Sequence, residues 1–142
     1  MSKIFEYALT VPQSAIDENG HANNIEYVRW MQEAAVAHST ERGWTNSRYD
    51  ELGAAWVARS HHIEYLRPAF AGEELVVQTW VADFHRLRSK RRYLIRRADD
   101  RKILARAETE WVFIDRNSGR PCSVPKELAS SFFVVPPEEE PK

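Results

Sequence analysis

The sequence contains a single cysteine, Cys122, among its 142 residues. One cysteine excludes an internal disulfide and a cysteine-based zinc cluster, as is typical of proteins from a reducing cytoplasm. Long apolar runs are also missing: no stretch approaches the roughly 18 apolar residues that a membrane helix needs, and the first residues lack the apolar core of a signal peptide. We therefore predict a cytoplasmic protein without a membrane partner.

An excess of charge of one sign is lacking too. The 20 Lys and Arg residues are balanced by 21 Asp and Glu residues, so the whole molecule has no attraction for nucleic acid. Hydrophobic residues make up 43% of the chain and charged residues 29%, as in an ordinary folded domain. We expect one domain over residues 1–134 and a disordered tail over 135–142, whose prolines and glutamates oppose packing.

Hydrophobic periodicity predicts a strand over 3–11 and then one long helix. Asn23 is a suitable N-cap, Glu26 would complete a capping box, and Gly43 is expected to end the helix. The apolar face of this helix is predicted from residues at i, i+3 and i+4 spacing: Ile25, Val28, Met31, Ala35 and His38.

After Gly53 the period changes to two. Strands are expected at 55–66, 73–85, 88–98 and 102–115, with a helical turn within 47–52 and a short helix or edge segment over 128–134. One long helix followed by four long strands indicates an α+β fold in which an antiparallel sheet wraps a helix.

Most of the candidate chemistry precedes the long helix. Asp17 and His21 lie just before its predicted start, and either side chain can handle protons. The free N–H groups of the first helical turn can stabilise a developing oxyanion. This combination suits hydrolysis.

The pattern Asp17-x-Asn19-x-His21-x-Asn23-Asn24-x-x-Tyr27-x-x-Trp30 resembles the signature of hot-dog-fold thioesterases. It is similar to the 4-hydroxybenzoyl-CoA thioesterase-like family, and its Asp-x-Asn-x-His core most resembles the plant acyl-carrier-protein thioesterases. A second segment, 62–75, resembles the strand–turn–strand part of the same family. The resemblance covers roughly residues 5–130 and implies a single hot-dog domain, a long central helix wrapped by an antiparallel sheet.

The resemblance implies catalytic roles for three residues. The carboxylate at the Asp17 position attacks the thioester carbonyl or activates water, and the sequence leaves both roles open. His21 would donate to the thioester oxygen or steer the water, and Asn19 would hold Asp17 or the water. The alternative is that Asp17 makes an Asx turn and that all three residues only shape the loop.

Four further residues are candidates for contact with the substrate. Asn24 is explained first as part of the helix cap, and Tyr27 either lines an acyl pocket or packs in the core. Arg59 and His62 could touch the substrate from a strand. His61 and His62 point to opposite faces of that strand and cannot share a metal, so neither a metal nor another cofactor is expected.

The sequence departs from the plant pattern in two ways. The plant enzymes carry two hot-dog repeats, whereas 142 residues hold one. They also carry an acid or a cysteine just after the Glu-Tyr-x-Arg strand, where Pro68 and Ala69 stand here. The Asp-Asn-His part is retained.

Half of the 20 Lys and Arg residues lie between positions 86 and 106. Arg88 and Arg91 in this basic run are candidates for binding the phosphates of coenzyme A. A solvated strand protected from aggregation by its charge explains the run equally well. Nucleic acid is disfavoured by the near-neutral chain, whereas an acidic acyl carrier protein would be attracted.

These observations and the resemblance predict an acyl-CoA thioesterase that releases a free acid and coenzyme A. Two alternatives stay open: a thioesterase for acyl carrier protein, and a non-catalytic acyl-thioester-binding protein with the same fold. The resembling proteins pair their sheets, which implies a homodimer or homotetramer. The Asp17 loop of one chain would then face residues 59–63 of the other.

Overall fold

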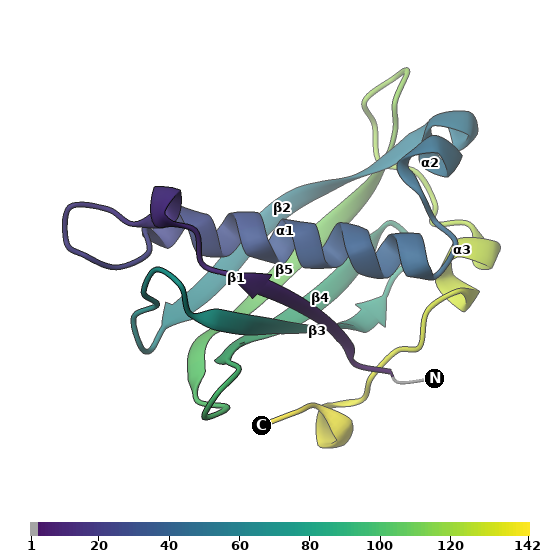
Figure 1. Cartoon of the computed structure of the whole chain (residues 1–142). Helices are drawn as coiled ribbons and strands as arrows, with labels where there is room; N and C mark the ends of the chain where they lie inside the picture. The colour runs from purple at the N-terminus through teal and green to yellow at the C-terminus, as the bar shows by residue number, and fades with distance from the viewer. Residues whose placement is uncertain (1–2) are drawn as a thin grey trace.

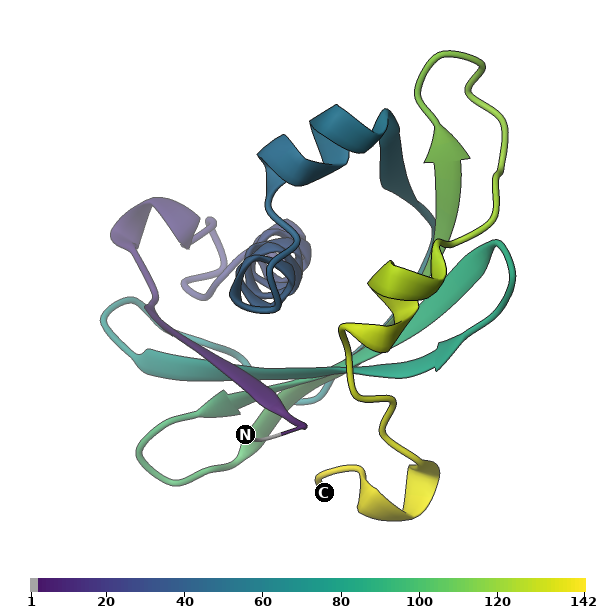
Figure 2. The ribbon, with the colours of Figure 1, turned by 90° about the vertical axis from the view of Figure 1, so that its right-hand side faces the viewer.

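A five-stranded antiparallel sheet curves around one long helix in the computed structural model, which describes residues 3–142. The spatial order of the strands is β1-β3-β4-β5-β2. Helix α1 (Asn24–Glu41) crosses the concave face of the sheet (Figure 1), and Figure 2 shows it end-on inside the curve. The strands are β1 (Phe5–Thr10), β2 (Ala54–Tyr65), β3 (Glu74–Phe84), β4 (Arg88–Arg97) and β5 (Ile103–Asp115). This is the predicted α+β arrangement.

Shorter elements complete the chain: 3-10 turns η1 (Gln13–Ala15) and η2 (Pro137–Glu139), and helices α2 (Asn46–Leu52) and α3 (Lys126–Ser130). The turn predicted within 47–52 is confirmed as α2, which ends at Gly53 with a φ of +76°. Within residues 3–142, no helix has both the length and the apolar content needed to cross a membrane.

The main core lies between α1 and the concave face of the sheet. Met31 and Ala34 of α1 are completely buried there, together with Val77, Tyr93 and Ile95 of the two neighbouring strands. Each fully buried side chain of the size of Met contributes roughly 1.5–3 kcal/mol. This packing fixes α1, and with it the loop that precedes α1.

The buried face of α1 is rotated relative to the predicted face. Tyr27 and Trp30 are 2% and 3% exposed, whereas Ile25 is 68% exposed. The aromatic side chains bury more apolar area than Ile25 would, so they take the inward positions. Met31 and His38 point inward as predicted.

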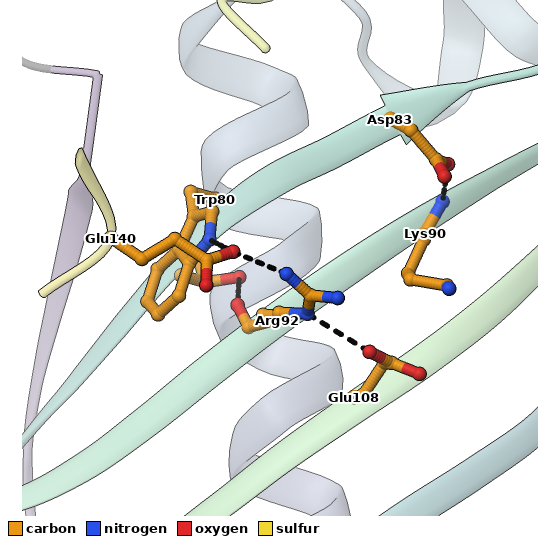
Figure 3. Close-up of polar contacts among 7 residues, drawn as sticks. Trp80, Asp83, Lys90, Arg92, Glu108 and Glu140 are labelled. Atoms are coloured by element: carbon orange, nitrogen blue, oxygen red, sulfur yellow. Dashed lines mark hydrogen bonds and ion pairs between the residues drawn. The ribbon is translucent and has the colours of Figure 1, made fainter. Parts of the chain in front are cut away.

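Residues 135–142 differ from the predicted disordered tail. Val135 is 1% exposed, and Glu140 accepts hydrogen bonds from Nε1 of Trp80 (2.9 Å) and Nη1 of Arg92 (2.6 Å). Figure 3 shows these contacts on the face of the sheet opposite α1. The charged tail is placed because β3 and β4 offer donors that match its carboxylate, and composition does not reveal such a match.

Candidate active site

Residues 16–22 form a closed loop before α1 (Figure 1), and its two ends pair as an antiparallel bridge. The N–H of Asp17 donates to the carbonyl of His21 (3.1 Å), and the N–H of Gly20 donates to the carbonyl of Asp17 (3.0 Å). Gly20 has a φ of +86°, which a residue with a side chain rarely adopts. The loop therefore presents Asp17 and His21 at the start of α1.

The carboxylate of Asp17 makes an Asx turn. Its Oδ1 accepts a hydrogen bond from the N–H of Asn19 at 2.9 Å, while the side chain of Asn19 is exposed. The backbone of Asn19, rather than the predicted amide, thus orients Asp17. Oδ2 of Asp17 has no hydrogen bond within residues 3–142. The two hypotheses for Asp17, an Asx turn and a catalytic role, are compatible, because the turn fixes one carboxylate oxygen and leaves the other for a ligand.

Asn23 caps α1 as predicted, since its Oδ1 accepts a hydrogen bond from the N–H of Ile25 at 2.9 Å. The predicted capping box does not form. The N–H of Asn23 donates instead to the carbonyl of Ala15 (3.0 Å), and the Glu26 carboxylate pairs with Arg29. The bond to Ala15 ties the start of α1 to the chain before the loop.

The first helical turn offers one donor to a ligand. The cap occupies the N–H of Ile25, and the N–H of Glu26 donates to the carbonyl of Asn23. Within the described residues, the N–H of Asn24 has no partner. This N–H lies at the N-terminus of α1, the positive end of the helix dipole, where an oxyanion is stabilised. The hydroxyl of Tyr65 donates to the carbonyl of Asn24 (3.0 Å) and ties the end of β2 to this turn.

Tyr27 packs in the core rather than in a pocket. Its ring is 2% exposed and meets the ring of Tyr65 edge-on, with 5.1 Å between the centroids. Burial raises the pKa of Tyr27, partly offset by a backbone hydrogen bond from Ala69. Of the two roles predicted for Tyr27, lining an acyl pocket or packing in the core, the structure therefore favours core packing.

A cavity of about 490 Å³ lies between the second half of α1 and the first residues of β2. This volume is typical of sites that bind small organic molecules. Its walls are rich in aromatic side chains from several elements of the chain: Trp44, Tyr49, Trp56, Phe84, Trp111 and Phe132. This cavity was not predicted from the sequence, although aromatic residues at the inward positions of several strands were a signal for it.

Arg91 lines this cavity and is only 6% exposed. Its Nη1 donates to Nδ1 of His38 (2.9 Å) and to Oγ1 of Thr79 (3.1 Å). Because side chains alternate along β4, Arg91 points toward α1, whereas Arg88 and Arg92 point to the opposite face. Arg91 and Arg88, the two predicted phosphate ligands, thus lie on different faces of the sheet, and only Arg88 is exposed.

His38 is neutral in the folded protein. Burial and the nearby charges of Arg91 and Arg42 lower its pKa from 6.5 to about 3. Since Arg91 can only donate, Nδ1 of His38 accepts and the ring proton sits on Nε2. The rings of Phe5 and Phe132 flank the imidazole, with centroids at 5.0 and 5.2 Å.

The remaining candidates stay on the surface. Arg59 and Arg88 both pair with Oε1 of Glu110, at 3.5 and 3.0 Å, so the structure brings these two arginines together. His62 is exposed on the same edge strand as Arg59. Further along the basic run, Arg92 pairs with carboxylates on both sides (Figure 3), as expected of a charge-protected sheet surface.

The Asp17 loop and the cavity lie at different ends of α1. The helix begins at Asn24, and Gln32, the first residue of α1 in the cavity wall, follows eight residues later. That is about 12 Å along the axis, since each helical residue rises about 1.5 Å. One chain therefore separates the carboxylate from its own cavity.

A helix wrapped by a curved antiparallel sheet, entered through a carboxylate-bearing loop, defines the hot-dog fold that the resemblance implies. Residues 11–132 match the thioesterase-like superfamily, and the chain belongs to that superfamily.

Three relatives illustrate this membership. Oleoyl-acyl carrier protein thioesterase 1 of Arabidopsis thaliana is 25% identical over 119 residues, which are 83% of this chain and 33% of the plant protein. The Bacillus subtilis protein named "Putative acyl-CoA thioesterase YneP" is 23% identical over 80% of this chain and 81% of its own length. A 1,4-dihydroxy-2-naphthoyl-CoA thioesterase from Synechocystis, 21% identical, superimposes with a TM-score of 0.83 over 90% of this chain and 94% of that chain. The chain thus spans about a third of the plant relative.

Proposed function

We propose that this protein is an acyl-CoA thioesterase. The observation that carries the proposal is the Asp17 carboxylate, fixed by an Asx turn in the loop that leads into α1, where the N–H of Asn24 has no partner within residues 3–142. Thioester hydrolysis requires a carboxylate that acts on the carbonyl carbon or on water, and a backbone donor for the oxyanion. The Bacillus and Synechocystis relatives, both named for CoA thioesters, support coenzyme A as the carrier.

The reaction balances with these groups alone. Asp17 either attacks the thioester carbon, giving an anhydride that water then cleaves, or removes a proton from an attacking water. In both routes the carbon–sulfur bond breaks, the thiolate leaves as coenzyme A, and the oxygen of water ends in the free acid. In this proposal the N–H of Asn24 stabilises the oxyanion, and His21 donates to the same oxygen.

We propose further that the active protein is at least a homodimer joined through β2; a homotetramer would contain the same pair. Within residues 3–142, β2 pairs with β5 alone, so its outer edge carries backbone groups without a strand partner there. An antiparallel copy would place the start of one β2 beside the end of the other. The end is tied to Asn24 through Tyr65, and the start lines the cavity. The Asp17 loop of one chain would then face the cavity of its partner.

An acyl-carrier-protein thioesterase is the second candidate, favoured by the plant relatives. Arg59 and Arg88 are exposed and close together, so they could bind either the phosphates of coenzyme A or an acidic carrier. Parallel assays with the same acyl group on the two carriers separate these candidates through kcat/KM.

Thiol release tests the proposal. We expect the wild-type protein to liberate thiol from acyl-CoAs, and Asp17→Asn to reduce kcat by roughly a thousandfold or more. The fold should persist, because Asn also accepts the hydrogen bond of the turn. His21→Ala should cost less, since the backbone donor remains. Wild-type turnover in Asp17→Asn, with an unchanged circular dichroism spectrum, would remove Asp17 from the mechanism.

A further inference from the structure

The cavity contains one buried positive charge among aromatic walls. Arg91 lies on β4 beneath α1, and 94% of its surface is removed from solvent. The other cation on the wall, Arg116, sits in an exposed turn at the cavity's rim. A guanidinium held so deep in an aromatic site requires an explanation, because an uncompensated buried charge is strongly unfavourable.

No carboxylate compensates Arg91. Every ion pair within residues 3–142 involves other side chains, and both hydrogen-bond partners of Arg91 are uncharged. His38 is neutral, and Thr79 uses its own proton to bond the carbonyl of Arg92 (3.0 Å). Burial lowers the pKa of Arg91, yet a guanidinium stays protonated in proteins.

The polar groups around Arg91 are neutral. Tyr93 lies two residues further along β4 and therefore on the same face of the sheet. Burial raises the pKa of the Tyr93 hydroxyl, and the nearby charge of Arg91 and hydrogen bonds with Thr109 and Trp111 oppose that rise. The guanidinium of Arg91 is thus surrounded by polar groups that carry no charge.

We propose that Arg91 binds a carboxylate at the far end of the acyl group, so that the preferred substrates are thioesters of dicarboxylic acids. This inference rests on the proposed thioesterase function and on its shared site, in which the acyl group bound near Asp17 of one chain enters the cavity of the other. The aromatic walls pack the body of the acyl group. The planar guanidinium then forms charge-assisted hydrogen bonds with its terminal carboxylate.

The melting temperature of an Arg91→Met variant distinguishes a purely structural role of Arg91 from a role in ligand binding. If Arg91 only held His38 and Thr79, replacing it with Met would lower the melting temperature. If Arg91 instead serves to bind a ligand, the substitution with Met removes an uncompensated charge at similar volume. The melting temperature of the protein without ligand then stays the same or rises. The matched control is Arg92→Met, the same change on the opposite face, which should lose its pairs with Glu108 and Glu140 (Figure 3).

The kinetic arm compares substrates that differ only at the far end. Mono-CoA thioesters of dicarboxylic acids with six, eight and ten carbons are each assayed against the monocarboxylic thioester of equal length, and 4-carboxybenzoyl-CoA against benzoyl-CoA. We expect wild-type kcat/KM to favour the carboxylate in at least one pair by roughly ten- to a hundredfold. Arg91→Met should bring that ratio close to one, Arg91→Lys should restore part of it, and Arg92→Met should keep it.

A binding arm works without turnover. Octanoate should raise the melting temperature of the wild-type protein more than octanamide does, and Arg91→Met should abolish the difference. Turnover without a preference in any substrate pair overturns this inference and leaves the thioesterase proposal standing. A preference for octanoate that depends on Arg91, without thiol release from any acyl-CoA, supports the anion site and rejects the thioesterase instead.

Discussion

At the scale of single residues, His38 makes the stability of the fold depend on pH. The folded protein holds His38 neutral with a pKa of about 3, whereas the unfolded chain titrates near 6.5. Between these values the unfolded state binds a proton that the folded state does not, so stability falls as the pH falls. From pH 7 to pH 5 this single group should cost about 2 kcal/mol of unfolding free energy.

Substituting His38→Asn tests this dependence, because the Asn oxygen replaces Nδ1 as the acceptor for Arg91 and does not titrate. Urea denaturation at the two pH values should show a smaller loss in the variant than in the wild type. His61, whose pKa burial also lowers, is unchanged in both proteins and cancels in the comparison. Equal losses in the two proteins would show that His38 is not the responsible group.

The structural roles of single residues could be predicted from the sequence only in part. Asp17 and Asn23 could be placed, because a loop acid and a cap are recognised from neighbours a few positions away. The role of Arg91 could not, since its position beneath α1 depends on the register of β4 against β3 and β5. A one-residue shift in register moves a side chain to the other face, and composition does not report register.

At the scale of elements, the cap of α1 links stability to the site. Asn23→Ala removes the acceptor for the N–H of Ile25 and should lower the unfolding free energy by about 1 kcal/mol. The freed donor changes the first turn next to Asn24, so kcat should fall as well. Asn23→Ser restores an acceptor and is the matched control. Chemical denaturation and thiol release are measured on both variants, and equal behaviour of Ala and Ser would argue against the cap.

The elements themselves were well predicted. Long periodic segments gave α1 and the strands from β2 to β5, because amphipathic patterns over ten or more residues leave few alternatives. The buried face of α1 was predicted only in part: Met31 and His38 are buried as predicted, whereas Ile25 was counted as inward and Tyr27 was left undecided. Charged composition similarly suggested disorder for 135–142, whereas Glu140 meets donors on β3 and β4. Both differences arise from tertiary contacts that override local pattern.

At the scale of the whole molecule, the separation between the Asp17 loop and the cavity gives the proposed dimer a distinctive test. In the proposed dimer each site combines the Asp17 loop of one chain with the cavity of the other, because about 12 Å of α1 separates Asn24 from Gln32 of the cavity wall, at about 1.5 Å per residue. Two variants can each lose one half. Asp17→Asn lacks the carboxylate, and Val36→Trp fills the mouth of the cavity at a side chain that is 50% exposed.

Mixing these two inactive variants should restore activity. In a mixed dimer, Asp17 of the Val36→Trp chain faces the open cavity of the Asp17→Asn chain, and the other site carries both defects. Random exchange makes half of the dimers mixed, so thiol release should recover to about a quarter of the wild-type rate. Light scattering should give a mass near 33 kDa, twice the 16.5 kDa of one chain. If each chain held a complete site of its own, the mixture would stay as inactive as its two components.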